Sequence, residues 1–310
     1  MMLTQTHLPI METENFKYVY GSLKFSIQER KLSVVLGAPG SGKTTVLKML
    51  ESENPTRNHY ILCSPNTTMK SMLLAIADAI NTDVKGDNDR IQTQITATLQ
   101  EDPNHCIIFD ECEYLHRGNV SKIDVLRQIY DQTGVPFVLC GTYKLKNLLV
   151  GNDKDEHDQP QIFRRLLKSE FNTIKKEEIL SYLDRLEKLY AVSFSQEAQT
   201  QLFSLCRDRG NGGLGIFIAL LELIFSIVRP EWKDITKQIQ YQETQNKIST
   251  LKQKDETLGR PAKENDPPED HGIPEDTDSL PFRFVDVAKL KVVVIDENTI
   301  RDASRFKMTK

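Results

Sequence analysis

Short apolar blocks alternate with segments of helical periodicity through the first half of the chain. The apolar blocks are rich in β-branched residues, are bounded by turn residues, and occupy residues 32–36, 60–63, 106–109 and 136–140. Blocks of this kind are typical of strands that are buried on both faces of a parallel sheet. Apolar side chains recur three and four positions apart in the intervening residues 44–50, 69–80, 91–99 and 123–130, which predicts helices. The pattern therefore predicts an α/β core.

The pattern changes near residue 175, because apolar residues then recur only at helical spacing. Three helices are predicted around residues 179–189, 198–205 and 214–228, and Pro230 should close the third. The third is the longest apolar stretch, but Glu222 interrupts it, and it falls short of the roughly 20 residues that span a membrane. We therefore expect a buried helix there, an α/β domain over residues 1–174 and a small helical lid over residues 175–250.

An acidic, proline-containing segment follows the predicted lid. Residues 251–280 contain four prolines, nine acidic and four basic residues, and almost no large apolar side chain, which predicts a linker. Residues 282–295 return to β-branched side chains and predict one or two strands. We expect residues 281–310 to be a C-terminal partner-binding segment that adds a strand to a partner's sheet, although packing against its own core is an equal alternative.

Overall charge and cysteine content restrict the class of protein. The 310 residues include 40 basic and 44 acidic ones, so the net charge of −4 argues against a general polyanion binder, and any nucleic-acid contact needs a local patch. The five cysteines are an odd number without a CxxC pair, which indicates a reducing compartment. The N-terminus lacks the pattern of a signal peptide. We expect a cytoplasmic protein with no membrane partner.

The strongest motif in the chain is a glycine-rich loop between a predicted strand and a predicted helix. Residues 37–44 read GAPGSGKT and match GxxxxGK[ST] at every fixed position. Glycines let backbone N–H groups surround a phosphate, and the helix N-terminus adds its positive dipole. We expect Lys43 to reach the β- and γ-phosphates of ATP and the Thr44 hydroxyl to ligate Mg²⁺. The predicted nucleotide-binding residues are Gly37, Ala38, Pro39, Gly40, Ser41, Gly42, Lys43, Thr44 and Thr45.

Two acids end the apolar strand at residues 106–109. Asp110 is predicted to hold Mg²⁺, directly or through water, and Glu111 to act as the general base that polarises the attacking water. The alternative is that these two acids only end the strand and have no role in catalysis. The presence of the glycine-rich loop in the same chain argues against it. We expect the loop and this acidic pair to lie at neighbouring strand tips.

Two further positions are candidates for catalytic roles. Thr142 follows the next predicted strand and could hydrogen-bond the attacking water or the γ-phosphate, unless the strand simply ends in a turn there. Arg164 and Arg165 precede the predicted lid, and one of them could stabilise phosphate charge from a neighbouring subunit. An internal ion pair or a solvated helix face is the alternative for these arginines. A trans-acting arginine would require an oligomer.

Together these motifs resemble those of AAA+ ATPases, and among them the TnsC and MuB transposition regulators with their TniB and IstB relatives. The resemblance runs from about residue 13 to residue 228, and its more particular parts are residues 109–115, FDECEYL, and 138–142, VLCGT. It implies an α/β P-loop core with a five-stranded parallel sheet, a helical lid and a C-terminal extension. It also implies an ATPase that assembles into a ring or filament on double-stranded DNA, marks the target site, and recruits the transposase and possibly target-selection proteins.

The resemblance also implies where DNA would bind. The loops that face DNA in this family correspond to residues 66–70 and 85–90, so Lys70, Lys85 and Arg90 are the candidate phosphate contacts. The alternative is solvated surface charge, which the nearby Asp87 and Asp89 favour. Many AAA+ lids carry GxxR, whereas residues 210–215 read GNGGLG without an arginine, which predicts weak hydrolysis stimulated by DNA or a partner.

Two other functions compete with transposition. One is a signalling or scaffold ATPase that gates a protein partner through the C-terminal segment without binding DNA. The other is a secretion-associated motor, which is disfavoured because the sequence has neither a membrane segment nor a peptidoglycan-binding extension.

Overall fold

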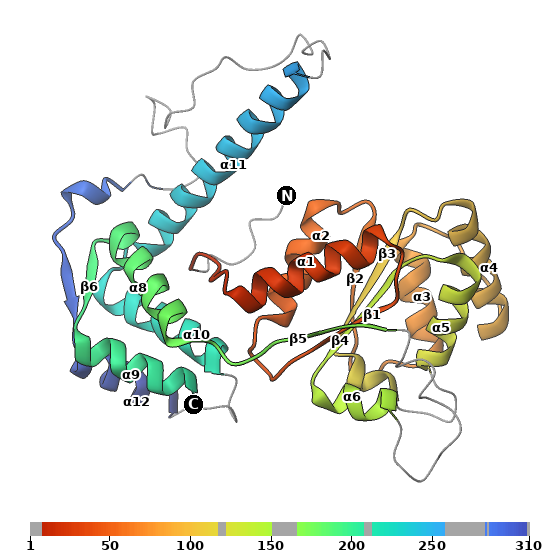
Figure 1. Cartoon of the computed structure of the whole chain (residues 1–310), viewed down its shortest axis with the longest axis horizontal. Coiled ribbons are helices and arrows are strands. Elements are labelled where there is room, and N and C mark those ends of the chain that lie inside the picture. The colour runs from red at the N-terminus through yellow and green to blue at the C-terminus, as the bar shows by residue number, and fades with distance from the viewer. Residues whose placement is uncertain are drawn as a thin grey trace. The chain divides into compact units, whose positions relative to one another are not determined.

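The computed structural model describes residues 8–116, 122–150, 166–207, 213–257, 283 and 285–308. The chain divides into two compact units. The larger unit comprises residues 12–174 and 206–216, and the smaller comprises residues 1–11, 175–205 and 217–310. Figure 1 labels most of their helices and strands.

The larger unit is built on a five-stranded parallel sheet, as the family resemblance implied. Its strands are β1 (Ser33–Leu36), β2 (Asn58–Leu62), β3 (Cys106–Asp110), β4 (Phe137–Gly141) and β5 (Leu167–Glu170). Their order across the sheet is β2-β3-β4-β1-β5. Strand β4 therefore lies between the strand that leads into the glycine-rich loop and the strand that ends at Asp110. The expectation that these two strands are neighbours was wrong, because sequence motifs do not reveal where a later strand inserts.

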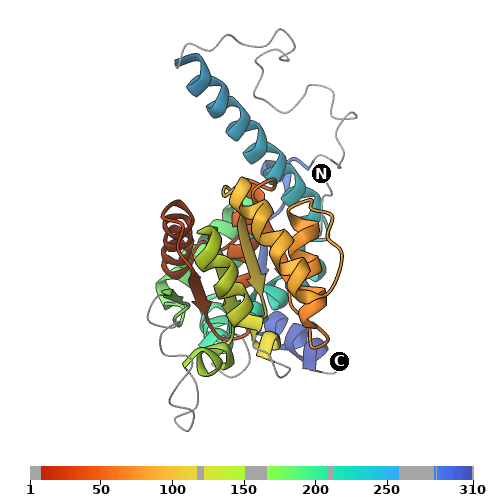
Figure 2. The same ribbon diagram turned by 90° about the vertical axis from the view of Figure 1, so that its right-hand side faces the viewer.

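Helices cover both faces of this sheet. They are α1 (Glu14–Gln28), α2 (Lys43–Glu53), α3 (Met69–Ala79), α4 (Asn88–Glu101), α5 (Lys122–Thr133) and α6 (Tyr143–Val150). One apolar cluster joins alternate strand residues to α1 and α2, and the other joins the remaining strand residues to α3, α4, α5 and α6. In β1, for example, Val34 belongs to one cluster and Val35 to the other. Figures 1 and 2 show red α1 on one side of the strands and orange to gold α3 and α4 on the other.

The smaller unit contains helices and one two-stranded parallel sheet. Its elements are α8 (Lys176–Tyr190), β6 (Val192–Phe194), most of α9 (Gln196–Arg207), most of α10 (Gly213–Val228), α11 (Trp232–Thr257), the 3-10 helix η3 (Val287–Lys289), β7 (Val293–Ile295) and α12 (Glu297–Met308). Pro230 follows the end of α10 as predicted. Helix α11 continues past residue 250, so the predicted linker boundary was too early. The helix can extend through residues 251–257, LKQKDET, because they contain no proline, which would break it; the next proline is Pro261.

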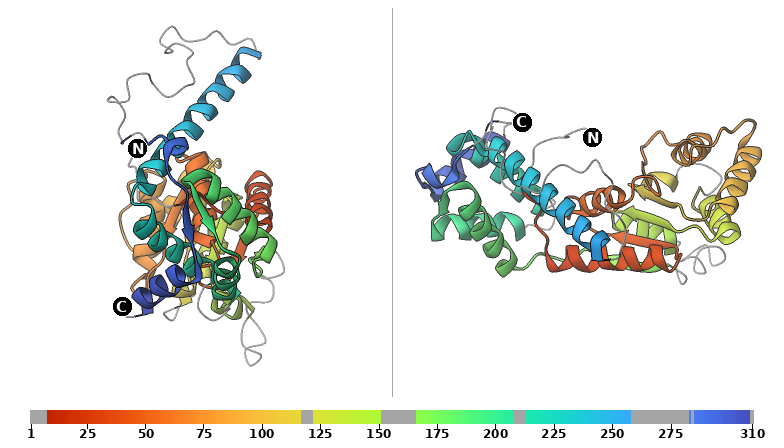
Figure 3. Two further views of the ribbon diagram at one scale, coloured as in Figure 1. Left: turned by 90° about the vertical axis from the view of Figure 1, so that its left-hand side faces the viewer. Right: turned by 90° about the horizontal axis from the view of Figure 1, so that it is seen from above.

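The C-terminal segment packs against its own chain. Strand β7 pairs with β6, and Ile295, Ile300 and Ala303 are fully buried. Figure 3 shows blue β7 beside green β6. Buried Arg229 bridges the segments that lead into the two strands, because its Nη2 donates to the carbonyls of Ala191 (2.7 Å) and Lys291 (2.6 Å). The partner-binding role expected for residues 281–310 stays a prediction.

Within the described part of the chain, none of the helices taken singly is long and apolar enough to span a membrane. Helices α10 and α11 reach the required length and hydropathy only as a pair bent by 117°. The apolar face of α10 is buried within the protein at Phe217, Leu220 and Leu221, which agrees with the predicted core helix.

Candidate functional site: the glycine-rich loop and the strand tips beside it

The glycine-rich loop connects β1 to α2 in a conformation that needs its glycines. Gly40 (φ 70°) and Gly42 (φ 99°) adopt the left-handed backbone conformation, which residues other than glycine rarely adopt. At Gly37, an added Cβ would lie 2.7 Å from Ser41 Oγ and 2.9 Å from Phe171 Cβ. The motif residues therefore fold into a tight loop at the N-terminus of α2.

Lys43, the first residue of α2, lies against this loop. The residue is only 9% exposed, and its Nζ donates hydrogen bonds to the carbonyls of Gly37 (3.0 Å) and Ala38 (2.9 Å). The ammonium is thus held beneath the loop, with its positive charge close to the backbone that a phosphate would contact.

Thr44 and Asp110 are in contact, although β1, which leads to the helix that carries Thr44, and β3, which ends at Asp110, are not neighbours in the sheet. The Thr44 hydroxyl donates to Asp110 Oδ2 at 2.7 Å, and Asp110 is 1% exposed. The Tyr60 hydroxyl donates to the same Oδ2 at 3.0 Å, which places a phenol from β2 at the same carboxylate. Burial, followed by the Asp110 charge, raises the pKa of Tyr60 well above its usual value, so this phenol stays a donor.

Two adjacent hard oxygens are suited to Mg²⁺. The Thr44 hydroxyl and the Asp110 carboxylate supply such oxygens, and Mg²⁺ commonly takes one or two protein oxygens and completes its shell with phosphate and water. The described residues contain no cluster of three or more histidine, cysteine or carboxylate ligands that could hold a metal by themselves. The residues therefore fit a metal that is shared with a bound phosphate.

Glu111 directly follows Asp110, the last residue of β3. Its backbone adopts φ 56° and its N–H donates to Asp110 Oδ1 at 2.9 Å. The pKa of Glu111 is raised, chiefly by desolvation and then by the charges of Asp110 and Glu113, while Lys43 opposes the shift. The two consecutive acids therefore have different surroundings: one is buried and hydrogen-bonded, and the other is exposed.

Thr142 lies between the last residue of β4 and the first residue of α6. Its hydroxyl accepts a hydrogen bond from the Lys144 N–H (3.4 Å), and its own N–H donates to Oε2 of Glu113 (3.3 Å). Glu113 lies on the short 3-10 helix η1 (Cys112–His116) directly after the Asp110–Glu111 pair. Sequence reasoning assigned Glu113 no role, because its partner lies 29 positions further along the chain.

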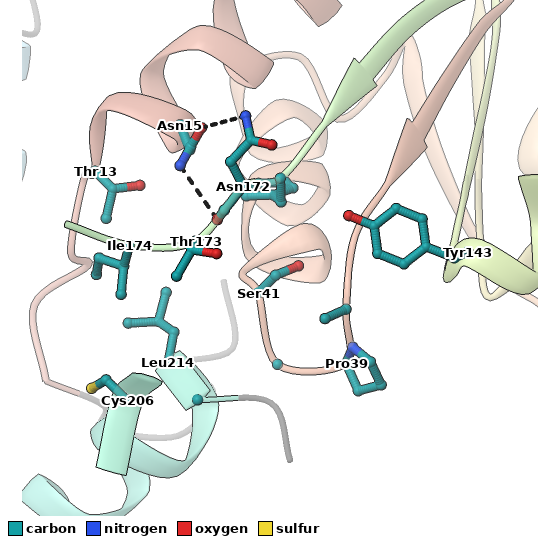
Figure 4. Close-up of a pocket in the computed structure, with 14 residues that line it drawn as sticks. Thr13, Asn15, Pro39, Ser41, Tyr143, Asn172, Thr173, Ile174, Cys206 and Leu214 are labelled. Carbon is teal, nitrogen blue, oxygen red and sulfur yellow. Dashed lines mark hydrogen bonds between the residues drawn. The ribbon is translucent and has the colours of Figure 1, made fainter. Parts of the chain in front are cut away.

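A cavity of about 560 Å³ opens beside the loop, entirely within the larger unit. Figure 4 shows its lining, which includes the start of α1, the glycine-rich loop, Tyr143, the chain after β5, the end of α9 and the start of α10. Asn15 and Asn172 are hydrogen-bonded to each other at its edge (3.4 and 3.5 Å). The Gly215 N–H donates to the Gly40 carbonyl at 3.0 Å, which fixes the start of α10 against the loop. Sequence reasoning missed this cavity.

Residues 27–149 match the sequence profile of a family described as AAA domain. This stretch contains the glycine-rich loop, Asp110, Glu111 and Thr142. Residues 27–149 form an AAA domain. The AAA+ resemblance expected from the motifs is thereby confirmed.

Proteins related in sequence to this chain include two phage proteins. The ATP-dependent target DNA activators B of Escherichia phages Mu and D108 are each 22% identical over 178 residues, which are 56% of this chain and 55% of the relative. The chain thus spans about half the length of the curated relatives it matches. The relation to MuB-type proteins expected from the sequence is therefore present, although it is distant.

A solved structure supports the fold. The Walker-type ATPase of Pyrococcus abyssi superposes with a TM-score of 0.53 and 14% identity, over 82% of this chain and 78% of that one. At this identity, the likeness concerns the fold alone. It agrees with the parallel sheet and flanking helices of the AAA domain.

The three basic candidates are all exposed and lie on the AAA domain. Lys70 is in the first turn of α3, Arg90 is in the first turn of α4, and Lys85 precedes α4. Helix α3 follows the end of β2, whereas α4 leads into the start of β3. The loop between the two helices runs back along α4, to which it is joined by the Thr82–Thr98 and Lys85–Gln94 hydrogen bonds. Both helices therefore begin toward the edge of the sheet where its strands end, which is also the edge of the glycine-rich loop.

Two expectations concern residues outside the described part of the chain. Arg164 and Arg165 lie there, as do residues 210–212 of the segment that lacks GxxR. Residues 213–215 of that segment are described and form the start of α10, next to the loop.

Proposed function

We propose that the AAA domain binds ATP with Mg²⁺ and hydrolyses it, and that this cycle serves an ATP-dependent regulator of transposition. The observation that carries the proposal is the hydrogen bond between Thr44 and Asp110 beneath a complete glycine-rich loop. It brings a hydroxyl and a carboxylate together beside backbone N–H groups and a lysine, which are the groups that a nucleoside triphosphate and its magnesium require.

Each residue of the loop region has a distinct role in this proposal. The backbone of residues 37–44 and Lys43 bind the phosphates, while Thr44 and Asp110 hold Mg²⁺, which neutralises phosphate charge when bound. Glu111 accepts a proton from the attacking water at its carboxylate, and Thr142 orients that water or the γ-phosphate. The 560 Å³ cavity has the size and the mixed apolar and amide lining that suit a nucleoside.

The transposition part of the proposal is supported by the relation to the two ATP-dependent target DNA activators. By analogy, the chain would form a homo-oligomeric ring or filament on duplex DNA, mark the insertion target, and recruit the transposase and target-selection proteins. In such an assembly, Arg164 or Arg165 would act on the nucleotide of the neighbouring subunit. The segment at residues 210–215 lacks an arginine, which favours weak hydrolysis that DNA or a partner stimulates.

DNA contact would come from Lys70, Lys85 and Arg90. Asp87 and Asp89 lie between Lys85 and Arg90 in the sequence, so one subunit offers only a small positive patch. An assembly repeats the patch along the duplex, and the contacts of successive subunits then add. Binding should therefore be cooperative, sensitive to salt and dependent on ATP.

Negative-stain electron microscopy of the full chain with duplex DNA, Mg²⁺ and ATP tests this proposal. Ordered rings or filaments should form with ATP and be absent for the Lys43→Ala variant, which serves as the matched control for nucleotide binding. Monomers alone in the wild-type sample would refute the assembly. If the full chain also captured a protein in an ATP-dependent manner, that result would support the alternative function, a signalling or scaffold ATPase. The mixture of basic and acidic residues around Lys85 favours this alternative over DNA binding.

A further inference from the structure

The carboxylate of Glu113 is fixed between the two strand tips that carry Glu111 and Thr142. Helix η1, on which it lies, is anchored close to β3, because Cys112 Sγ donates to the Phe109 carbonyl (3.4 Å) and the Tyr114 N–H donates to the Glu111 carbonyl (3.1 Å). From this anchored position, Glu113 Oε2 accepts the Thr142 N–H at 3.3 Å. One carboxylate therefore links the end of β3 to the end of β4.

The packing at Gly141 shows how closely this carboxylate approaches β4. A Cβ at Gly141 would collide with Glu113 Oε2 and would lie 3.0 Å from the Leu145 side chain. Any side chain at the last position of β4 would therefore displace the Glu113 carboxylate from its present place. The carboxylate lies at the N-terminus of α6, where the helix dipole stabilises negative charge.

We propose that Glu113 is a positioning residue that holds Thr142 at a fixed place relative to Glu111. The inference rests on the ATPase activity proposed above. Glu113 does not touch the phosphates in this account. It acts through the Thr142 amide, and its loss would leave the Thr142 hydroxyl free to shift with the first turn of α6.

Two variants separate the hydrogen bond from the rest of the side chain. Glu113→Ala removes the acceptor, whereas Glu113→Gln keeps an oxygen that can accept the Thr142 N–H. Glu101→Ala, at an exposed glutamate in the last turn of α4, is the matched control. For each protein, ATP turnover is measured for kcat and KM, nucleotide affinity is measured by calorimetry, and amide hydrogen exchange is followed across residues 141–150 without nucleotide.

We expect Glu113→Ala to exchange roughly tenfold faster at Thr142 and the first turn of α6, the size that loss of a hydrogen bond to a charged acceptor predicts. Its kcat should fall roughly tenfold while nucleotide affinity changes less than twofold. Glu113→Gln should restore most of the amide protection and most of kcat, and the Glu101→Ala control should match wild type.

Three results would overturn the inference: wild-type exchange in Glu113→Ala, a loss of kcat that only follows lost nucleotide affinity, or no rescue by Glu113→Gln. A wild-type protein that does not hydrolyse ATP would instead refute the proposed activity. Hydrogen exchange would then still decide whether Glu113 holds Thr142.

Discussion

The hydroxyl of Thr44 lies 2.7 Å from Oδ2 of Asp110. Strand β1 leads into the loop before Thr44, β3 ends at Asp110, and β4 lies between these two strands in the sheet. The contact is possible because Thr44 is in the first turn of α2, which starts above the sheet edge where β3 ends. It joins the loop that would bind phosphate to the acidic strand tip.

Removing the Thr44 hydroxyl should weaken ATP binding only when Mg²⁺ is present. We expect Thr44→Ala to lose roughly 10- to 100-fold in Mg²⁺-dependent affinity, since hydrogen bonds to charged groups contribute about 1.5–3 kcal/mol. Thr44→Ser keeps the hydroxyl and should stay close to wild type. Calorimetry with and without Mg²⁺ measures the difference, and an equal loss in both conditions would argue against a role for Thr44 at the metal.

Replacing the proposed base should separate ATP binding from hydrolysis. Glu111→Gln keeps the size of the side chain but cannot accept a proton from water, so turnover should fall roughly 10²- to 10⁴-fold while affinity for ATP is retained. Assemblies on DNA should then persist after mixing with ATP. A coupled phosphate-release assay measures turnover, and a normal rate in this variant would refute the assignment.

The three basic candidates should contribute to DNA binding through phosphate contacts. Each of Lys70→Ala, Lys85→Ala and Arg90→Ala should weaken DNA binding alike for all sequences and reduce the slope of log affinity against log salt by roughly one. Arg127→Ala is a suitable control, because half-buried Arg127 on α5 already pairs with Asp131. Fluorescence anisotropy at several salt concentrations tests this, and unchanged slopes in all three variants would mean that these residues do not contact DNA.

Arg229 should stabilise the pairing of the C-terminal strand with β6. Arg229→Ala leaves two carbonyls without their charged donor and should cost about 1.5–3 kcal/mol of the local stability of that sheet. Arg301→Ala removes only an exposed pair with Glu297 and should cost less than about 0.5 kcal/mol. Hydrogen exchange of residues 191–195 and 291–296 compares the two variants, and equal protection in both would contradict the role of Arg229.

The sequence predicted those parts of the sheet that are buried on both faces. Val34 and Val35 point to opposite apolar clusters, so β1 reads as a continuous apolar block, and β3 and β4 behave in the same way. Strand β5 reads LKSE and lies at the edge of the sheet, where little apolar surface is needed, so only the family resemblance suggested a fifth strand.

Helix α1 escaped prediction for a different reason. Its buried Phe16, Val19 and Leu23 follow helical spacing, but exposed Tyr18 and Phe25 interrupt the contrast between its apolar and polar faces. Thr13, whose side chain accepts the Phe16 N–H, is a capping signal that could have located its start.

The nucleotide motifs could be read from the sequence because their residues are close together in the chain. The cavity lining and the Glu113 contact could not, because both depend on segments that only the sheet brings together. Asn15 and Asn172 are 157 positions apart and carry no local motif. Likewise, no local pattern indicates that Glu113 would meet Thr142 rather than solvent.

Isothermal titration calorimetry of the folded full chain with ATP and Mg²⁺ tests the central claim most directly. The account predicts saturable heat with one nucleotide per chain, and no heat for Lys43→Ala, whose fold is checked by circular dichroism. A folded wild-type protein that gives no heat with ATP or with ADP would contradict the nucleotide site and, with it, the proposed ATP-dependent assembly on DNA.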